Sequence, residues 1–95
     1  MAFISHKEDR KKIGKDLRTV QFGWPLGMPL VRSLGGGLWE VRSRILHGIA
    51  RIIFILINRD IVLLNGFVKK TQKTPQEELR LAKTRAKKYK QEEEK

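Results

Sequence analysis

The stretch from Ile49 to Ile57 constrains the fold more than any other part of the sequence. It is rich in isoleucine and apolar on both faces, with Arg51 as its single charged residue. Such a pattern predicts a central strand that is covered on both sides. Asn58-Arg59-Asp60 then predicts a three-residue connection, and Ile61 to Val68 predicts the partner strand of a hairpin.

Helices are predicted before and after these strands. The first runs from about Lys7 to Phe22 and begins with an S-x-x-E capping box at Ser5 and Glu8. The last begins with a second capping box, Thr74-Pro75-Gln76-Glu77, with proline at the first helical position. The apolar stripe of the first helix is Ile13, Leu17 and Val20, and that of the last is Leu79, Ala82, Ala86 and Tyr89.

A further strand is predicted between the first helix and the central strand. Leu38 to Arg42 alternates between apolar and charged residues, as a half-exposed strand does, and it follows a sharp turn at Gly35-Gly36-Gly37.

These elements predict an α+β fold: an N-terminal helix, an antiparallel sheet of three or more strands, and a C-terminal helix. The length of 95 residues allows a single domain over residues 1–95, and Gln91 to Lys95 is predicted to be a frayed tail. No membrane span or signal peptide is recognised, which predicts a cytoplasmic protein without membrane partners.

Composition narrows the choice of function. The net charge of +11 predicts polyanions or acidic proteins as partners. The absence of cysteine excludes disulfides, thiolate metal sites and a cysteine nucleophile. The acids Asp9, Asp16 and Asp60 are scattered, which argues against a two-metal nuclease. We therefore expect neither a metal nor a cofactor.

Hairpin geometry places the side chains of the two long strands. A loop at residues 58–60 sets Ile57 opposite Ile61, Arg51 opposite Phe67 and Ile49 opposite Lys69. Residues of one parity then share a face, and the even-numbered set is wholly apolar, which predicts that it packs on a helix. That set consists of Ala50, Ile52, Phe54, Leu56, Val62, Leu64 and Val68.

The opposite face is predicted to gather cations at one end of the sheet. Arg42 returns to this end through the 43–48 loop, beside Arg51 and Asn65. The basic residues Lys69, Lys70 and Lys73 follow directly, and His47 lies in the adjoining loop. Two interpretations of Arg51 stay open: a salt bridge to Glu40 or to a helix acid, or a guanidinium that awaits a phosphate. The lysines could equally form a solvated loop.

A cationic cluster without metal ligands is compatible with cleavage of RNA. The 2′-hydroxyl of the substrate can attack the adjacent phosphorus if the protein supplies a base, an acid and cations. Arginine stays protonated, whereas neighbouring cations can lower the pKa of a lysine, and histidine titrates near neutrality. His47 and the lysines are therefore the candidates for proton transfer, although His47 could be a loop residue without a role.

Four segments together carry a resemblance to a known family. They are Gly23-Trp24-Pro25-Leu26-Gly27-Met28-Pro29, Leu38-Trp39-Glu40-Val41-Arg42, Gly48-Ile49-Ala50-Arg51-Ile52-Ile53-Phe54 and residues 62–75. These segments resemble the HigB-like, phage-derived toxins of the RelE/ParE superfamily of type II toxin–antitoxin systems. The resemblance extends from about Glu8 to Tyr89, and G-F-V-K-K-T-Q-K-T-P is its most specific block.

The resemblance implies a metal-free, ribosome-dependent mRNA endonuclease that inhibits translation and growth. Its implied partners are the ribosome, mRNA and a HigA-like helix-turn-helix antitoxin, for which the net charge predicts an acidic contact surface. Arg42 and Arg51 match the strand arginines of the family site, and Lys69, Lys70 and Lys73 match its basic loop. Our expected catalytic residues are Arg51, Arg42, Lys69 and His47, and our expected RNA-binding residues are Lys70, Lys73, Arg44 and Asn65.

The chain departs from the family pattern in two places. Many relatives carry histidine where this chain has Asn65, and many begin with an additional strand and helix ahead of Lys7. The resemblance thus implies an apparently shortened N-terminal hairpin and a sheet edge without its usual cover. Two other functions stay open: ParE-like inhibition of DNA gyrase without hydrolysis, and a basic RNA- or protein-binding module without activity.

Overall fold

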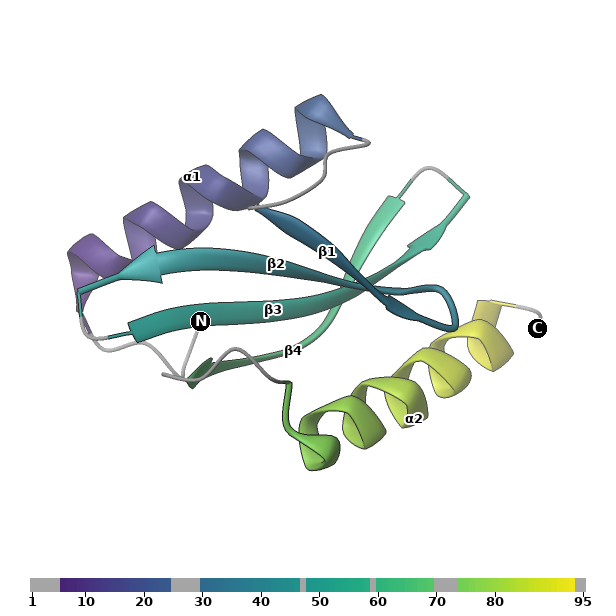
Figure 1. Cartoon of the computed structure of the whole chain (residues 1–95). Coiled ribbons are helices and arrows are strands. Elements are labelled where there is room, and N and C mark those ends of the chain that lie inside the picture. Colours follow the sequence, from purple (N-terminus) through teal and green to yellow (C-terminus); the bar gives the residue numbers. More distant parts are fainter. Residues whose placement is uncertain (1–5, 25–29, 47, 59, 70–73, 94–95) are drawn as a thin grey trace.

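The fold consists of a four-stranded antiparallel sheet between two helices (Figure 1). The computed structural model describes residues 6–24, 30–46, 48–58, 60–69 and 74–93. The elements follow one another as α1 (Lys7–Gly23), β1 (Val31–Gly35), β2 (Leu38–Ile45), β3 (Gly48–Ile57), β4 (Asp60–Lys69) and α2 (Gln76–Glu93). The strands lie side by side in chain order, β1-β2-β3-β4. The predicted α+β class is confirmed.

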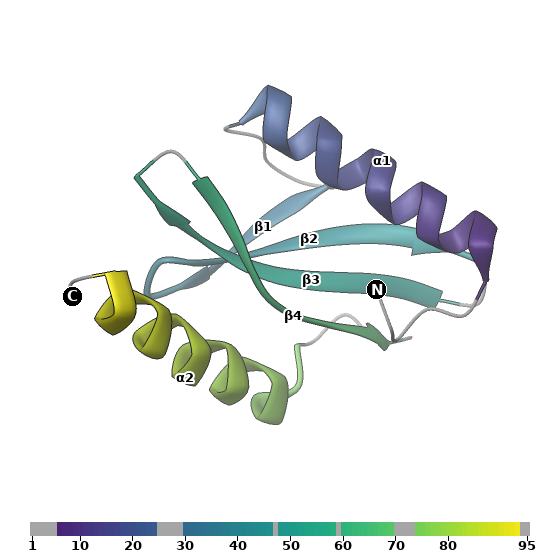
Figure 2. The ribbon, with the colours of Figure 1, turned by 180° about the vertical axis from the view of Figure 1, so that it is seen from behind.

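The two helices cover opposite faces of the sheet, as the front and back views show (Figures 1 and 2). Helix α1 packs over β2, and its predicted stripe residues Ile13 and Val20 are buried. Helix α2 packs over β4 and β3, where Ala82 and Ala86 are buried. Strand β3 therefore lies in the middle layer, which confirms the expected central strand covered on both faces.

Helix α1 begins at Lys7, as predicted, and two of its acids hold it to the sheet. Its N-cap position is His6, and no side-chain capping hydrogen bond is present among the described residues. The predicted capping box includes Ser5, which lies outside the described residues, so it stays a prediction. Two acids of α1 reach the sheet: Asp9 Oδ1 accepts from the backbone N–H of Leu46, and Asp16 accepts from the hydroxyl of Ser43. These contacts hold the helix to β2 and to the residue that follows it.

A strand that the sequence did not indicate, β1, forms one edge of the sheet. It pairs with β2 through the turn at Gly35, Gly36 and Gly37, all of which have positive φ angles. Glycine adopts this conformation without the steric cost that a side chain imposes. The predicted sharp turn is therefore confirmed. Strand β2 runs on past its pairing with β1, which ends at Val41.

The β3–β4 hairpin keeps the predicted register at one end and loses it at the other. Arg51 lies opposite Phe67 and Ile49 opposite Lys69, as expected, but Ile57 pairs with Asp60. The connection therefore has two residues rather than three. Its first residue, Asn58, has a φ of 58°, which asparagine tolerates. A register shift between Ile53 and Phe54 reconciles the two ends.

This irregularity changes which side chains share a face. The even-numbered residues of β3 pack toward α1, as predicted, with Ala50, Ile52 and Phe54 buried there. Val62 and Leu64 pack instead in the cluster under α2, so the prediction of one wholly apolar even-numbered face is wrong. The physical reason is that a bulge places two residues of one strand opposite one residue of its partner, which inverts parity beyond it.

The interior divides into two apolar clusters, one on each side of the sheet. Under α1, Trp24 packs edge-to-face on Trp39 and Phe54, with ring centroids 4.9 and 5.6 Å apart. Under α2, Leu79 packs with the buried alanines against Ile53 and Ile55. The small alanine side chains bring α2 close to the sheet and keep water out of this layer. A polar group buried there costs free energy unless it is hydrogen-bonded. Helix α2 extends through residues 91–93 of the segment predicted as a frayed tail, and residues 94–95 lie outside the described residues.

Candidate functional site

Two arginines lie directly opposite each other on the face of the sheet that α2 covers. The β2–β3 register pairs Arg42 with Arg51, and the β3–β4 register continues the row to Phe67. Side chains at directly opposed positions of antiparallel strands lie next to each other. The predicted juxtaposition of the two strand arginines is therefore confirmed.

Arg51 is paired with Glu40 rather than open to solvent. Its Nη1 lies 3.4 Å from Oε1 of Glu40, and neither residue has any exposed surface. The sequence left open whether Arg51 forms a salt bridge or awaits a phosphate. The structure shows the salt bridge, with Glu40 as the partner. Because Glu40 is fully buried, the expectation of a half-exposed strand at Leu38–Arg42 is wrong for this position.

Thr74 and Arg32 complete the contacts of the buried carboxylate. The hydroxyl of Thr74 donates to Oε2 of Glu40 at 2.7 Å and accepts from Nη2 of Arg32 at 3.1 Å. Nη2 of Arg32 also lies 3.7 Å from Oε1 of Glu40. Thr74 precedes α2, so this network connects β1, β2 and β3 to the segment that leads into the helix. We call Arg32, Glu40, Arg42, Arg51 and Thr74 the arginine cluster.

The arginine cluster carries excess positive charge. Its three arginines face the single carboxylate of Glu40, and the formal sum is +2. Burial is the main cause that lowers the pKa of Arg51; Glu40 opposes this effect, and Arg42 and Arg32 add to it. A guanidinium nevertheless stays protonated at neutral pH. The cluster is therefore a source of positive potential at one end of the sheet.

Asn65 contacts α2 rather than solvent. Its Nδ2 donates to the backbone carbonyl of Glu78 at 3.2 Å and lies 3.3 Å from Oε1 of the same residue. Its Oδ1 is buried without a hydrogen-bond partner among the described residues. Close by, Nη1 of Arg85 donates to the backbone carbonyl of Leu64 at 2.7 Å. These bonds hold α2 on the bulged part of β4.

The remaining predicted site residues fall into two groups. Lys69 ends β4 opposite Ile49, two residues beyond the position that faces Arg51. His47, Lys70 and Lys73 lie outside the described residues.

Arg44 lines a hollow of about 250 Å³ at the part of β2 that β1 does not reach. We call it the edge hollow. Arg42, Lys12 and Asp16 also line it, so it connects one member of the arginine cluster with α1. Three of its four charged lining residues are cations.

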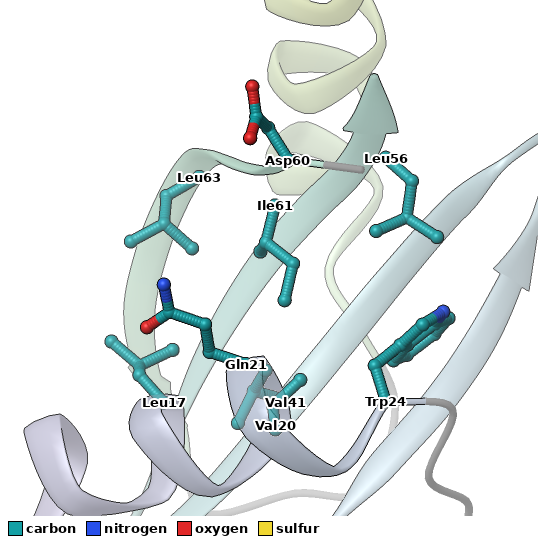
Figure 3. A pocket seen from close by; sticks show the side chains of 9 residues that line it. All are labelled: Leu17, Val20, Gln21, Trp24, Val41, Leu56, Asp60, Ile61 and Leu63. Carbon is teal, nitrogen blue, oxygen red and sulfur yellow. The ribbon is translucent and has the colours of Figure 1, made fainter. Parts of the chain in front are cut away.

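A second hollow, of about 340 Å³, has a different character (Figure 3). It lies between the C-terminal part of α1 and the β3–β4 hairpin, and Figure 3 shows Ile61 pointing toward the helix. Asp60 is the one charged residue of its lining, and the other lining side chains are Leu17, Val20, Gln21, Trp24, Val41, Leu56, Ile61 and Leu63. A hollow without cations does not suit a phosphate, so we do not assign RNA to it.

Sequence reasoning missed two members of the arginine cluster. Arg32 belongs to β1, where the alternation of Val31, Arg32 and Ser33 could have indicated a strand facing Glu40. Thr74 was expected to cap α2, but the described contacts of its hydroxyl are those with Glu40 and Arg32. No local signal separates a threonine cap from a threonine that bonds to a buried acid.

The sequence matches the family described as Phage derived protein Gp49-like (DUF891) over residues 5–87. The chain belongs to this family. It is a RelE/HigB-type toxin-like family, so this Gp49-like chain is consistent with a toxin-like role in a toxin–antitoxin system. A comparison with curated proteins found no match.

Two further features of the Gp49-like chain concern metals and membranes. Within the described residues, no three histidine or acidic side chains lie together in a group that could hold a metal ion. Neither of the two described helices is long and apolar enough to cross a membrane.

Proposed function

We propose that the protein is an mRNA endonuclease toxin that cleaves RNA on the ribosome without a metal ion. The observation that carries this proposal is the row of Arg42 and Arg51 on neighbouring strands, in a cluster with one carboxylate for three arginines. Excess positive charge in a partly dehydrated setting stabilises the negative charge that develops on a phosphorane. Membership of a toxin-like family supports the same function.

In the proposed reaction, the 2′-hydroxyl of the substrate attacks the neighbouring phosphorus. The 5′-oxygen of the next nucleotide leaves, so the products are a 2′,3′-cyclic phosphate and a 5′-hydroxyl. A base removes the proton of the 2′-hydroxyl, and an acid protonates the leaving oxygen. Lys69 and His47 are our candidates for these two proton transfers, and Lys70 and Lys73 for binding the RNA backbone.

The two strand arginines have different tasks in this proposal. Arg42 and Arg44 line the edge hollow, and we propose that they contact phosphate oxygens there. Arg51 has no exposed surface, so we give it a positioning role: it holds Glu40 and adds positive potential beneath the site. A direct contact between Arg51 and RNA would require the arginine cluster to open. Asn65 holds α2 through Glu78, which supports a structural role over the RNA contact expected from sequence.

The proposed partners follow from the same charge. We expect a HigA-like helix-turn-helix antitoxin whose acidic surface covers this end of the sheet, and we expect the ribosome to present the mRNA. An antitoxin that leaves this end of the sheet uncovered would contradict the first expectation.

Cleavage of ribosome-bound mRNA by the purified full-length protein tests the function. We expect cutting to stop when the ribose at the cut site is replaced by deoxyribose. Cutting of the deoxyribose substrate would rule out attack by the 2′-hydroxyl. If the protein instead inhibits gyrase supercoiling and leaves mRNA intact, the endonuclease proposal is wrong and the gyrase alternative is favoured. Metabolic labelling and mapping of mRNA 5′ ends after induction extend the test to cells.

A further inference from the structure

The outward side of α1 is a second cationic surface, separate from the arginine cluster. Its basic residues Lys7, Arg10, Lys11, Lys15 and Arg18 are all exposed and line one shallow hollow. We call these five residues the α1 ridge. Gly14 lies among them, and no atom approaches the space where its side chain would be. A bound chain could therefore lie close to the helix backbone at this point.

The acids of α1 leave the ridge largely uncompensated. Asp9 accepts from the backbone N–H of Leu46, and Asp16 is bound by Ser43 and Lys12, so both turn toward the sheet. Glu8 is the remaining acid of the helix, and it lies 4.0 Å from Lys11. The five cations of the α1 ridge thus have Glu8 as the one exposed acid of the same helix. Like charges four residues apart, as at Lys7, Lys11 and Lys15, destabilise an isolated helix, and an external anion relieves that repulsion.

The ridge is continuous with the edge hollow. Lys12 and Arg44 line the edge hollow and also a neighbouring hollow to which Lys7 contributes. Glu8 and Asp9 line this neighbouring hollow too, and Asp9 is bound by the backbone N–H of Leu46. Cations therefore continue from Arg42, across the edge of β2 that β1 does not cover, to the outside of α1. A flexible polyanion bound at the arginine cluster could follow this route onto the helix.

An exposed aromatic ring lies at the far end of the ridge. Phe22 is 84% exposed and lines a hollow with Lys15 and Arg18. Exposure of a large ring costs stability unless it has a partner. Cations beside an accessible aromatic ring are typical of surfaces that bind single-stranded nucleic acid, where the phosphates meet the charges and a base stacks on the ring.

We propose that the α1 ridge binds the sugar–phosphate backbone of single-stranded RNA, at a position beyond the phosphodiester that is cleaved. The inference rests on the proposed function, because it extends the path of the same RNA. The exposed ring of Phe22 favours RNA over an acidic protein, since bases stack on it whereas carboxylates do not.

The test compares two variants that remove the same charge from different helices. The first carries Lys7→Gln, Lys11→Gln, Lys15→Gln and Arg18→Gln; the control carries Arg80→Gln, Lys83→Gln, Lys87→Gln and Lys90→Gln, all at exposed positions of α2. Glutamine is a good helix former, and circular dichroism confirms that both variants are folded. The probe is a labelled single-stranded 2′-O-methyl RNA, which lacks the attacking hydroxyl, so that binding is measured without cleavage.

We expect the ridge variant to raise the Kd about tenfold or more and to reduce the slope of log K against log salt by about 2–3, since each phosphate contact contributes about 0.7. The control should change the Kd less than threefold. Phe22→Ala should raise the Kd about fivefold or more, whereas Leu81→Ala, at an exposed apolar position of α2, should not.

Equal losses in the two charge variants would overturn the proposal, because they would indicate general attraction to a basic protein. A ridge variant that binds RNA normally but no longer binds polyglutamate would also overturn it and would indicate an acidic protein partner. Failure of the endonuclease proposal is distinguishable: unmodified RNA then stays uncut by the wild-type protein, whatever the binding measurements give.

Discussion

The guanidinium of Arg51 lies 3.4 Å from the carboxylate of Glu40, and both side chains are completely buried. Taking two charges out of water is costly, and their attraction compensates for this only when further hydrogen bonds satisfy the pair. Thr74 supplies one such bond to Glu40. The pair is therefore part of the packing between the sheet and the start of α2 as well as of the candidate site.

Removal of either member of this pair should destabilise the protein strongly. We expect Arg51→Met or Glu40→Gln alone to lower the free energy of unfolding by about 3–5 kcal/mol, because each leaves a buried group without its partner. The double variant should cost clearly less than the sum of the two. Urea denaturation of the four proteins measures this coupling. Strictly additive losses would show that the two side chains do not stabilise each other.

The hydroxyl of Thr74 should matter for stability more than an exposed hydroxyl does. Thr74→Val keeps the shape but leaves Glu40 without its 2.7 Å hydrogen bond, and we expect a loss of about 1–3 kcal/mol. Thr84→Val is the matched control, since that exposed hydroxyl bonds to the carbonyl of Arg80 on its own helix. Thermal or urea unfolding should show a change within about 0.5 kcal/mol for the control. Similar losses in both variants would contradict the role given to Thr74.

Arg42 should affect RNA cleavage with little effect on folding. Arg42→Gln removes a charge from the edge hollow, and we expect the cleavage rate on ribosome-bound mRNA to fall about 10²–10³-fold, the effect of losing one donor to a developing oxyanion. Arg80→Gln on the exposed side of α2 removes the same charge and should leave the rate almost unchanged. Single-turnover cleavage measures both. Equal rates for the two variants would remove Arg42 from the proposed site.

Asn65 should act through the position of α2. In Asn65→Asp, a carboxylate replaces the amide that donates to Glu78, so acceptor oxygens face the carbonyl and carboxylate of that residue. We expect a loss of about 1–3 kcal/mol, of which Glu78→Gln recovers a part. The loss should shrink at low pH, where the introduced carboxyl is protonated and can donate. A loss that is independent of pH and of Glu78 would contradict this account.

Local patterns in the sequence determined most of the elements. The apolar run at residues 49–57 was enough for a central strand, and the stripe of Ile13, Leu17 and Val20 was enough for α1. The loop expected at residues 43–48 was enough to bring Arg42 to the end of the sheet that holds Arg51, and the structure pairs the two directly. These features depend on the period of a helix or a strand, which neighbouring residues express directly.

Only the tertiary structure decided the surroundings of those arginines. The bulge in β4 moved Val62 and Leu64 to the other face, and a two-residue turn replaced the expected three-residue turn. The burial of Arg51 depends on Glu40, Arg32 and Thr74, which come from three separate segments. Such contacts join residues up to 42 positions apart. The periodicity of neighbouring residues carries no information about which distant residues come into contact. The sequence thus determined that the cations would meet, whereas packing against α2 decided which of them are buried.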